Sequence, residues 1–320
     1  MRRINPGGAL LLGLGLLLAG AAHTDEALDT NLYDRDGCRL AVHVSADFQP
    51  AEQADLLTWV EFIATSLAQV YGHWPLQQWQ ISVAPATSAT AGDPIPWAQV
   101  YREHPTRVEF FTAPSASPDA LQRAWTGYHE LAHLLIPYRG WGDAWFSEGL
   151  ASYYQNLMQA RAGVITEQQM WQKLYDGFQR GLADTAFDGV PLAEVSDNMR
   201  QDGGFMRVYW SGAWYFLAAD TRLRLQSGGQ RNLDLALAEL NRCCRDQSLS
   251  VPAIVRQLDR LNRVVLFEIL YDELVVAEQV PAFDDIFASL GIDVVDGEVT
   301  LQTEGPGARL RSQIARGNGL

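Results

Sequence analysis

Hydrophobic residues recur with two periods along the chain, and the change of period divides it into parts. In the N-terminal third, short segments alternate apolar and polar residues, which is typical of strands, and one long segment has helical spacing. We therefore predict a helix and several strands here, separated by a loop rich in Ala, Thr, Gly and Pro. The strands are expected over 37–46, 79–83 and 107–111, the helix over 51–71 and the loop over 84–96.

The pattern becomes almost wholly helical after Ser117. Ser117 and Pro118 are typical of a helix start, and the helix that they begin is expected to continue to Pro137. A second helix is expected from about Asp143 to Arg161, after a turn rich in glycine. Further helices are expected over 166–182, 205–225, 231–245, 251–260 and 263–278, and period two returns in a short hairpin over 292–301.

These patterns predict an α+β protein in two halves. A small mixed α/β half is expected over 23–136 and a mainly helical half over 137–290, followed by a C-terminal hairpin and tail over 291–320. The helices on either side of the junction face each other in this plan. Because ligand sites usually lie in clefts between such halves, we look for the site there.

The first 22 residues form a segment of another kind. Arg2 and Arg3 precede an apolar run from Ala9 to Ala22 that ends in small residues. This arrangement is typical of a bacterial secretory signal peptide, and the run is short for a membrane span. We therefore expect a periplasmic or secreted protein with no stable membrane span after the leader is cleaved.

The formal net charge of the chain is −14, and it becomes −16 when Arg2 and Arg3, the only charged residues before His23, are removed. Such an acidic surface argues against nucleic acid and against anionic membranes as partners. The sequence leaves the oligomeric state open.

The three cysteines are Cys38, Cys243 and Cys244. Neighbouring cysteines do not bridge each other easily, so any disulfide is expected to join Cys38 to Cys243 or to Cys244. The alternative is that all three are plain core thiols. Metal binding by the pair has no support from a CxxC spacing or a nearby histidine.

Two histidines four residues apart flank a glutamate: His129, Glu130 and His133 form an HExxH motif. On a helix both imidazoles point to the same side, where they suit a zinc ion. Glu130 points sideways, so we expect it to act as the general base that takes a proton from zinc-bound water. The alternative, a surface helix with solvated histidines, leaves the apolar neighbours unexplained: Tyr128, Leu131, Ala132, Leu134, Leu135 and Ile136.

A carboxylate follows on the next predicted helix, in the segment Trp145-Phe146-Ser147-Glu148-Gly149. Catalytic zinc needs three protein ligands and an open position for water. We therefore expect Glu148 to complete the ligand set of one zinc ion per chain, with His129 and His133.

With its ligands in this order, the chain resembles the gluzincins, thermolysin-like peptidases whose third ligand is a glutamate on a following helix. It is most similar to the glycyl-aminopeptidase family and more distantly to the membrane-alanyl-type aminopeptidases. The resemblance lies in 129–133, 145–154 and 207–213, and more weakly in 283–291 with the hairpin. It implies a thermolysin-like catalytic domain and a zinc metallopeptidase that hydrolyses peptide bonds, so that the expected partner is a peptide or protein substrate.

The resemblance also implies a role for Tyr209, which matches the family's active-site tyrosine, three positions before Gly212. A neutral phenol near the metal donates a hydrogen bond to the tetrahedral oxyanion. The alternative is a core aromatic, because apolar residues surround Tyr209 in the sequence. Ser152, one turn after Glu148, is expected either to support the ligands or to permit close helix packing.

Two further expectations concern the substrate. By analogy with the superfamily, the strand at 108–112 is expected to pair as an edge strand with an extended peptide. Trp141 and Trp145 flank the turn between the two zinc helices, where they either line a subsite or fill the core.

The chain departs from the family pattern in several places. Ser211 stands where a lysine is usual, the spacer between His133 and Glu148 is 14 residues long, and no amine-recognition segment precedes His129. Exo and endo cleavage therefore both stay open. Two classes of function remain, a zinc peptidase and an inactive relative that binds or assembles at the bacterial envelope, with a zinc hydrolase of non-peptide amides as a third. Retention of all three ligands and the glutamate favours the enzyme.

Overall fold

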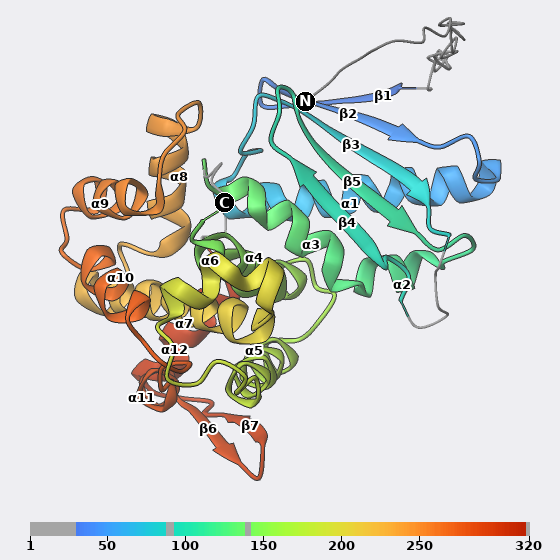
Figure 1. The fold of residues 1–320 in the computed structure, drawn as a ribbon. Helices are drawn as coiled ribbons and strands as arrows, with labels where there is room; N and C mark the ends of the chain where they lie inside the picture. Colours follow the sequence, from blue (N-terminus) through green and yellow to red (C-terminus); the bar gives the residue numbers. More distant parts are fainter. Residues whose placement is uncertain (1–29, 88–92, 138–141, 318–320) are drawn as a thin grey trace, which may run out of the picture.

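A sheet and the helices on one of its faces form one side of the molecule, and an assembly of helices forms the other (Figure 1). The computed structural model describes residues 30–87, 93–137 and 142–317. The expected leader lies outside the described residues. This arrangement confirms the α+β class, with a mixed half followed by a mainly helical half.

The five-stranded sheet has the strand order β1-β2-β3-β5-β4. Its three inner strands are parallel, and each edge strand is antiparallel to its neighbour. The predicted strands are confirmed as the inner strands, whereas both edge strands were missed. The bounds are β1 Thr30–Arg35, β2 Cys38–Val44, β3 Gln78–Pro85, β4 Trp97–Tyr101 and β5 Thr106–Thr112.

The strand order corrects one expectation. The strand at 108–112 is not an edge strand, because β5 lies between β3 and β4 and its backbone pairs on both sides. The edge on that side is β4, which lies just past the segment predicted as a loop. All five residues of β4 are at least partly exposed, so it lacks the apolar alternation that predicts a half-buried strand.

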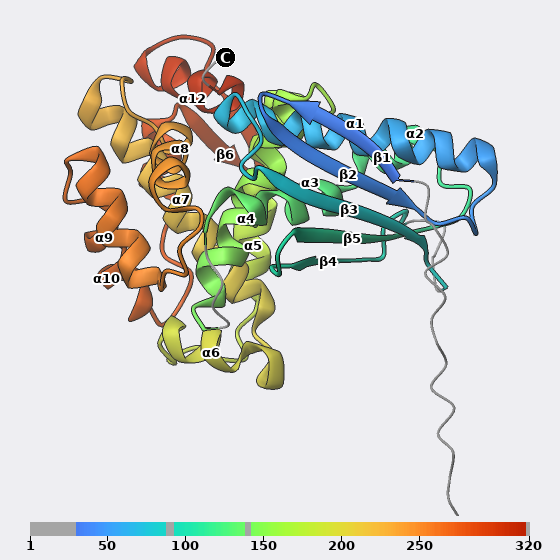
Figure 2. The ribbon, with the colours of Figure 1, turned by 90° about the horizontal axis from the view of Figure 1, so that it is seen from above.

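Helix α1 (Pro50–Tyr71) connects β2 to β3 and covers one face of the sheet (Figure 2). Alternate residues of each inner strand point toward it and are buried, as the period of two predicts. Trp59 of α1 packs edge-on against Phe110 of β5, with ring centroids 5.2 Å apart. This contact holds the sheet and the helical layer together.

The predicted long helix over 117–136 is broken. The structure has α2 (Pro118–Arg123), α3 (Trp125–Ala132) and a 3₁₀ turn, η1 (His133–Leu135), with Ala124 in an extended conformation between the first two. Side chains satisfy the carbonyl groups at the break, since Tyr128 donates to Gln122 and Gln159 donates to Arg123. These tertiary hydrogen bonds compensate for the missing helical ones, and periodicity does not reveal them.

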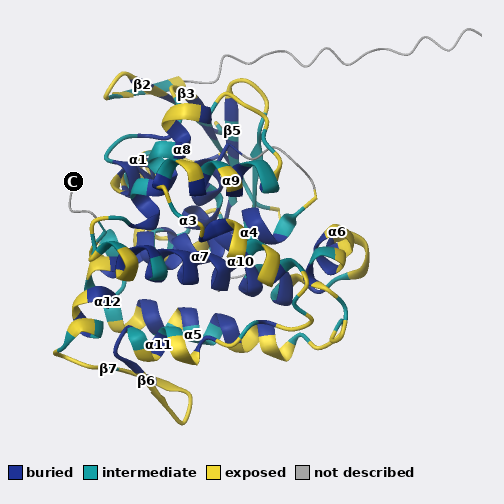
Figure 3. Cartoon of the chain, turned by 90° about the vertical axis from the view of Figure 1, so that its left-hand side faces the viewer, coloured by how far each residue is buried: buried dark blue, intermediate teal, exposed yellow. Residues whose placement is uncertain are grey.

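Helices α4 (Ala144–Arg161) and α7 (Phe205–Ser227) form the centre of the helical half, where most residues are buried (Figure 3). They approach closely because glycines face each other. A Cβ on Gly149 would overlap the backbone of Gly212, and a Cβ on Gly212 would overlap the carbonyl oxygen of Trp145. Both helices thus carry a residue that only glycine can replace without a shift.

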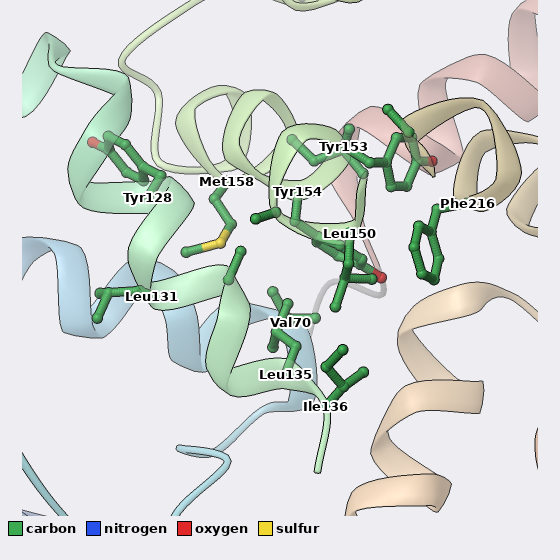
Figure 4. Packing of buried hydrophobic residues seen from close by; sticks show 14 of the residues in the cluster. Val70, Tyr128, Leu131, Leu135, Ile136, Leu150, Tyr153, Tyr154, Met158 and Phe216 are labelled. Atoms are coloured by element: carbon green, nitrogen blue, oxygen red, sulfur yellow. The ribbon is translucent and has the colours of Figure 1, made fainter. Parts of the chain in front are cut away.

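A single apolar cluster joins the two halves. Side chains of α1, α3, η1, α4 and α7 meet in it, with Val70 of α1 near Leu135 and Leu150 (Figure 4). The helices that carry the predicted ligands are therefore embedded in the core. The residues that Figure 4 labels are Val70, Tyr128, Leu131, Leu135, Ile136, Leu150, Tyr153, Tyr154, Met158 and Phe216.

The remaining elements surround this centre. Helices α6, α11 and α12 were missed, and the expected tail after the hairpin is in fact α12, which packs against α4, α5 and α7. Arg311 of α12 donates to the carbonyls of Leu290, Gly291 and Gln302. The bounds are α5 Glu167–Ala183, α6 Leu192–Asp202, α8 Leu233–Cys244, α9 Val251–Asn262, α10 Phe267–Val275, α11 Asp284–Ser289, β6 Ile292–Val295, β7 Glu298–Leu301 and α12 Pro306–Arg316.

The cysteine expectation is wrong. Cys243 and Cys244 at the end of α8 form a disulfide with each other, and Cys38 is a free, buried thiol at the start of β2. The Cys38 thiol donates instead to the carbonyl of Trp74. No helix among the described residues is long and apolar enough to cross a membrane.

Candidate metal centre

Three side chains from two helical segments meet where the halves join. His129 of α3, His133 of η1 and Glu148 of α4 each offer one ligand atom, and these atoms lie within 4.8 Å of one another. One Glu148 carboxylate oxygen lies 3.2 Å from Nε2 of His129 and 3.7 Å from Nε2 of His133. Both imidazoles are buried. The structure thus brings together the three residues that the sequence predicted as ligands.

Each imidazole is oriented by a second side chain on α4. Nδ1–H of His129 donates to Gln155 at 2.8 Å, and Nδ1 of His133 hydrogen-bonds to the Ser147 hydroxyl at 2.9 Å. With Nδ1 engaged, Nε2 of each ring faces the Glu148 carboxylate. A partner on the outer nitrogen fixes the tautomer and orientation of a metal-binding histidine.

The sequence analysis did not identify Gln155 or Ser147, although their spacing from Glu148 could have indicated them. Gln155 lies seven residues after Glu148, two turns along the same face of α4, and Ser147 directly precedes that glutamate. Ser152, the residue that was expected to support the ligands, is buried and its carbonyl accepts from Asn156. This contact lies within its own helix, in agreement with the packing alternative.

The two imidazoles differ in their electrostatics. Burial lowers the pKa of His133 to about 3, so this ring is neutral near pH 7. Burial also disfavours charge on His129, but the hydrogen bond and negative charge of Glu148, together with the charge of Glu130, outweigh it and raise the pKa. For Glu148, attraction to both histidines outweighs the effect of burial and lowers the pKa to about 2. A carboxylate and imidazole nitrogens converging at one point are the donors that zinc prefers.

Glu130 does not belong to this ligand cluster, as the sequence predicted. Burial is the main cause that raises the pKa of its carboxyl group to about 7. A carboxyl group that titrates near neutral pH can both accept and release a proton there. Its placement between the two histidines keeps it within electrostatic range of His129 and Glu148.

The Tyr209 hydroxyl of α7 lies at the site, while its partly buried ring also packs against the apolar core. Its phenol hydrogen-bonds to the Glu148 carboxylate, and its ring stacks on the His129 imidazole with centroids 6.1 Å apart. Burial and the nearby Glu148 raise the pKa of the phenol, so it stays protonated and can donate. The close approach at Gly149 and Gly212 explains this contact, because each glycine lies within one turn of Glu148 or Tyr209.

The two tryptophans of the sequence analysis have different outcomes. Trp145 is fully buried and packs against Phe146 and Tyr215, in agreement with the core alternative. Trp141 lies outside the described residues. A third tryptophan, Trp125, is half exposed on α3 and packs edge-on against His129 with centroids 5.4 Å apart. Sequence reasoning did not single out Trp125, although it lies one turn before His129.

Comparison with known proteins agrees with this geometry. The M61 glycyl aminopeptidase family matches the chain over residues 141–216, a segment that holds Glu148 and Tyr209. No curated protein matches the sequence. The family match confirms the resemblance to glycyl aminopeptidases stated from the sequence.

The fold is that of aminopeptidase N-like zinc peptidases. An aminopeptidase N family protein from Idiomarina loihiensis superposes with a TM-score of 0.60 at 15% identity, covering 83% of this chain and 49% of that one. An M1 zinc metallopeptidase from Deinococcus radiodurans gives a TM-score of 0.50 at 17% identity, covering 80% and 53%. The chain therefore spans about half the length of these proteins. The chain thus shares its fold with part of these proteins and one segment with the glycyl aminopeptidase family.

Proposed function

We propose that the chain is an exported, zinc-dependent metallopeptidase that hydrolyses peptide bonds. The observation that carries this proposal is the convergence of His129, His133 and Glu148, with Glu130 and Tyr209 beside them. Export rests on the leader-like first 22 residues, and we propose a periplasmic or secreted location.

The donor set fits one zinc ion per chain. Both imidazoles have their outer nitrogen engaged, so each presents Nε2 toward the carboxylate. Two imidazole nitrogens and one carboxylate oxygen within 4.8 Å match the ligand set of a catalytic zinc site, in which water takes the fourth position. A zinc ion held there acts as a Lewis acid, polarising the scissile carbonyl group and lowering the pKa of water.

Glu130 and Tyr209 supply the proton chemistry. The Glu130 carboxylate accepts the proton of the attacking water and then delivers it to the leaving nitrogen, a task that suits a pKa of about 7. The Tyr209 phenol, which burial keeps protonated, donates a hydrogen bond to the oxygen on which negative charge develops. The two residues lie on different helices, so they can act on the substrate from separate sides.

The substrate class follows from the sheet and from a relative. With β5 in the interior of the sheet, the strand that has a free edge on the side of α3 is β4. An extended peptide is proposed to pair there, because a free edge presents unpaired backbone groups. A mutant of the Deinococcus radiodurans enzyme, TM-score 0.50 at 17% identity, has been crystallised with a Tyr-Ser-Ala substrate, which supports peptides as the class.

Incubation of the purified mature protein with a peptide library, with and without a zinc chelator, tests the proposal. The expected result is cleavage that chelator abolishes and zinc restores, and sequencing of the products distinguishes exo from endo action. Glu130→Gln is the control for a contaminating peptidase. A wild-type protein that binds zinc but cleaves no peptide would contradict the enzyme and support the inactive binding protein instead.

A further inference from the structure

The second histidine of the motif lies beyond the end of its α-helix. Helix α3 ends at Ala132, and His133 is the first residue of the 3₁₀ turn η1. In a continuing α-helix, the His133 carbonyl would accept from the N–H of residue 137, but that residue is Pro137, which has none. The turn that holds this histidine therefore needs donors from outside the helix.

Arg102, the residue directly after β4, supplies such donors. Its Nη2 donates to the His133 carbonyl at 2.6 Å, and its Nη1 donates to the Ile136 carbonyl at 3.3 Å. The two carbonyl groups belong to the first residue of η1 and to the residue that follows its end, and the planar guanidinium spans them. A cation at this end of the helix also suits the partial negative charge of the helix C-terminus.

A second side chain binds a carbonyl group that lies between those of His133 and Ile136 in the sequence. The hydroxyl of Tyr71, at the end of α1, donates to the Leu135 carbonyl in the buried core. Three carbonyl groups of the segment 133–136 thus bind side chains of the N-terminal half. Tyr71 is buried, whereas Arg102 is partly exposed.

We propose that Arg102 is a positioning residue of the metal centre, which holds η1 so that the His133 imidazole is presented to the zinc ion together with His129 and Glu148. This inference rests on the proposed zinc site. Arg102 acts through the backbone of the ligand and touches neither substrate nor metal. Its role is the backbone counterpart of the Ser147 hydroxyl, which orients the same imidazole from its ring nitrogen.

Zinc affinity is the property that separates this role from a merely structural one. The metal-free protein is titrated with zinc in competition with a chelator of known affinity, and its thermal unfolding is measured beside it. Arg102→Met removes the donors and keeps the length of the side chain, and Arg102→Lys keeps a charge and a single donor group. Arg107→Met is the control, because Arg107 contacts Ser82, Glu109 and Tyr101 of the same sheet.

We expect Arg102→Met to weaken zinc binding about 10- to 100-fold, as the loss of a group that supports a ligand typically does. Arg102→Lys should lie between this variant and wild type, and Arg107→Met should bind zinc as wild type does. Should Arg102→Met fail to fold, Arg102→Lys against Arg107→Met decides by the same measurement.

Two outcomes would overturn the inference. If the Arg102 variants unfold at lower temperature yet bind zinc as tightly as wild type, Arg102 only stabilises the fold. If Arg107→Met lowers the affinity for zinc as much as Arg102→Met does, the effect comes from the loss of a positive charge and not from the hydrogen bonds that Arg102 donates to the backbone of η1. A wild-type protein that binds no zinc would instead overturn the proposed function, so the two failures are distinguishable.

Discussion

At the scale of single residues, Glu130 differs from the two flanking histidines, because we expect it to transfer a proton and not to bind the metal. It lies between two ligands but outside the ligand cluster, and its pKa of about 7 suits proton transfer. We expect Glu130→Gln to keep the fold and the zinc ion and to lose roughly three or more orders of magnitude in kcat. Peptide hydrolysis and zinc content are measured on the same sample. A variant with wild-type kcat would show that another group is the base.

Tyr209 is expected to act mainly in the transition state. Its phenol reaches Glu148 while the ring packs on His129. Tyr209→Phe keeps the ring and its packing, so stability and KM should change little while kcat falls about 10²- to 10³-fold. Steady-state kinetics and thermal unfolding check this together. Equal kcat in both proteins would leave the phenol without a catalytic role.

The proposed ligands and the proposed base could be identified from the sequence because the short spacings between these residues indicate zinc chemistry. His129 and His133 share one face of a helix, and Glu148 follows on the next helix. The residues that orient them were harder to find. Arg102 binds the backbone of η1 from 31 residues away. No local pattern predicts such a contact, because it depends on how the sheet edge meets the helix.

The predicted disulfide of Cys38 was wrong because the tertiary fold decides which cysteines meet. The rule that neighbouring cysteines rarely bridge is a statement about strain in a short ring. It led to Cys38 as the partner, but Cys38 is buried at the start of β2, where its thiol contacts the carbonyl of Trp74. Whether that residue can reach Cys243 or Cys244 depends on the tertiary fold.

At the scale of elements, the close contact between α4 and α7 brings residues of the site together. Gly149 and Gly212 let α4 and α7 approach, so that Glu148 and Tyr209 meet. We expect Gly212→Ala to destabilise the protein by about 1–3 kcal/mol through overpacking and to lower kcat by moving Tyr209 away. Ala218→Gly, on the same helix, is the control, since it should cost about 0.5–1 kcal/mol without lowering kcat. Equal kcat losses in both would point to general destabilisation.

The elements that the sequence predicted are those with a buried stripe. The inner strands, α1, α4 and α7 all have this pattern, and their existence was predicted. The missed strand β4 is partly exposed throughout, and β1 shows only weak burial. Helix α12 was hidden behind a hairpin pattern, although Pro306 begins it as a good first helical residue. Elements without a clear stripe of apolar residues are therefore harder to predict from the sequence.

The break at Ala124 could not be predicted from the sequence, for another reason. Every residue from Pro118 to Ala132 is compatible with one continuous helix. The break exists because Tyr128 and Gln159 satisfy the freed carbonyl groups. Such compensation comes from side chains that meet only in the folded protein.

At the scale of the whole molecule, the metal centre joins the two halves. Two ligands belong to the expected N-terminal half and Glu148 belongs to the helical half. Zinc that binds only the folded chain should therefore stabilise it, by about 2.7 kcal/mol at a free concentration 100 times Kd. Thermal unfolding with and without zinc measures this. Glu148→Gln is the control, and a rise in Tm as large as that of wild type would place the stabilising ion elsewhere.

The measurement that tests the central claim most directly is the zinc content of the mature protein after gentle purification. The account predicts about one zinc ion per chain in wild type, and roughly a tenth or less in His129→Ala, because the site then lacks one of its three ligands. Tm of the metal-free proteins controls for folding. Wild type with less than about a tenth of an equivalent, or His129→Ala with as much zinc as wild type, would contradict the assignment of His129, His133 and Glu148 as the metal centre.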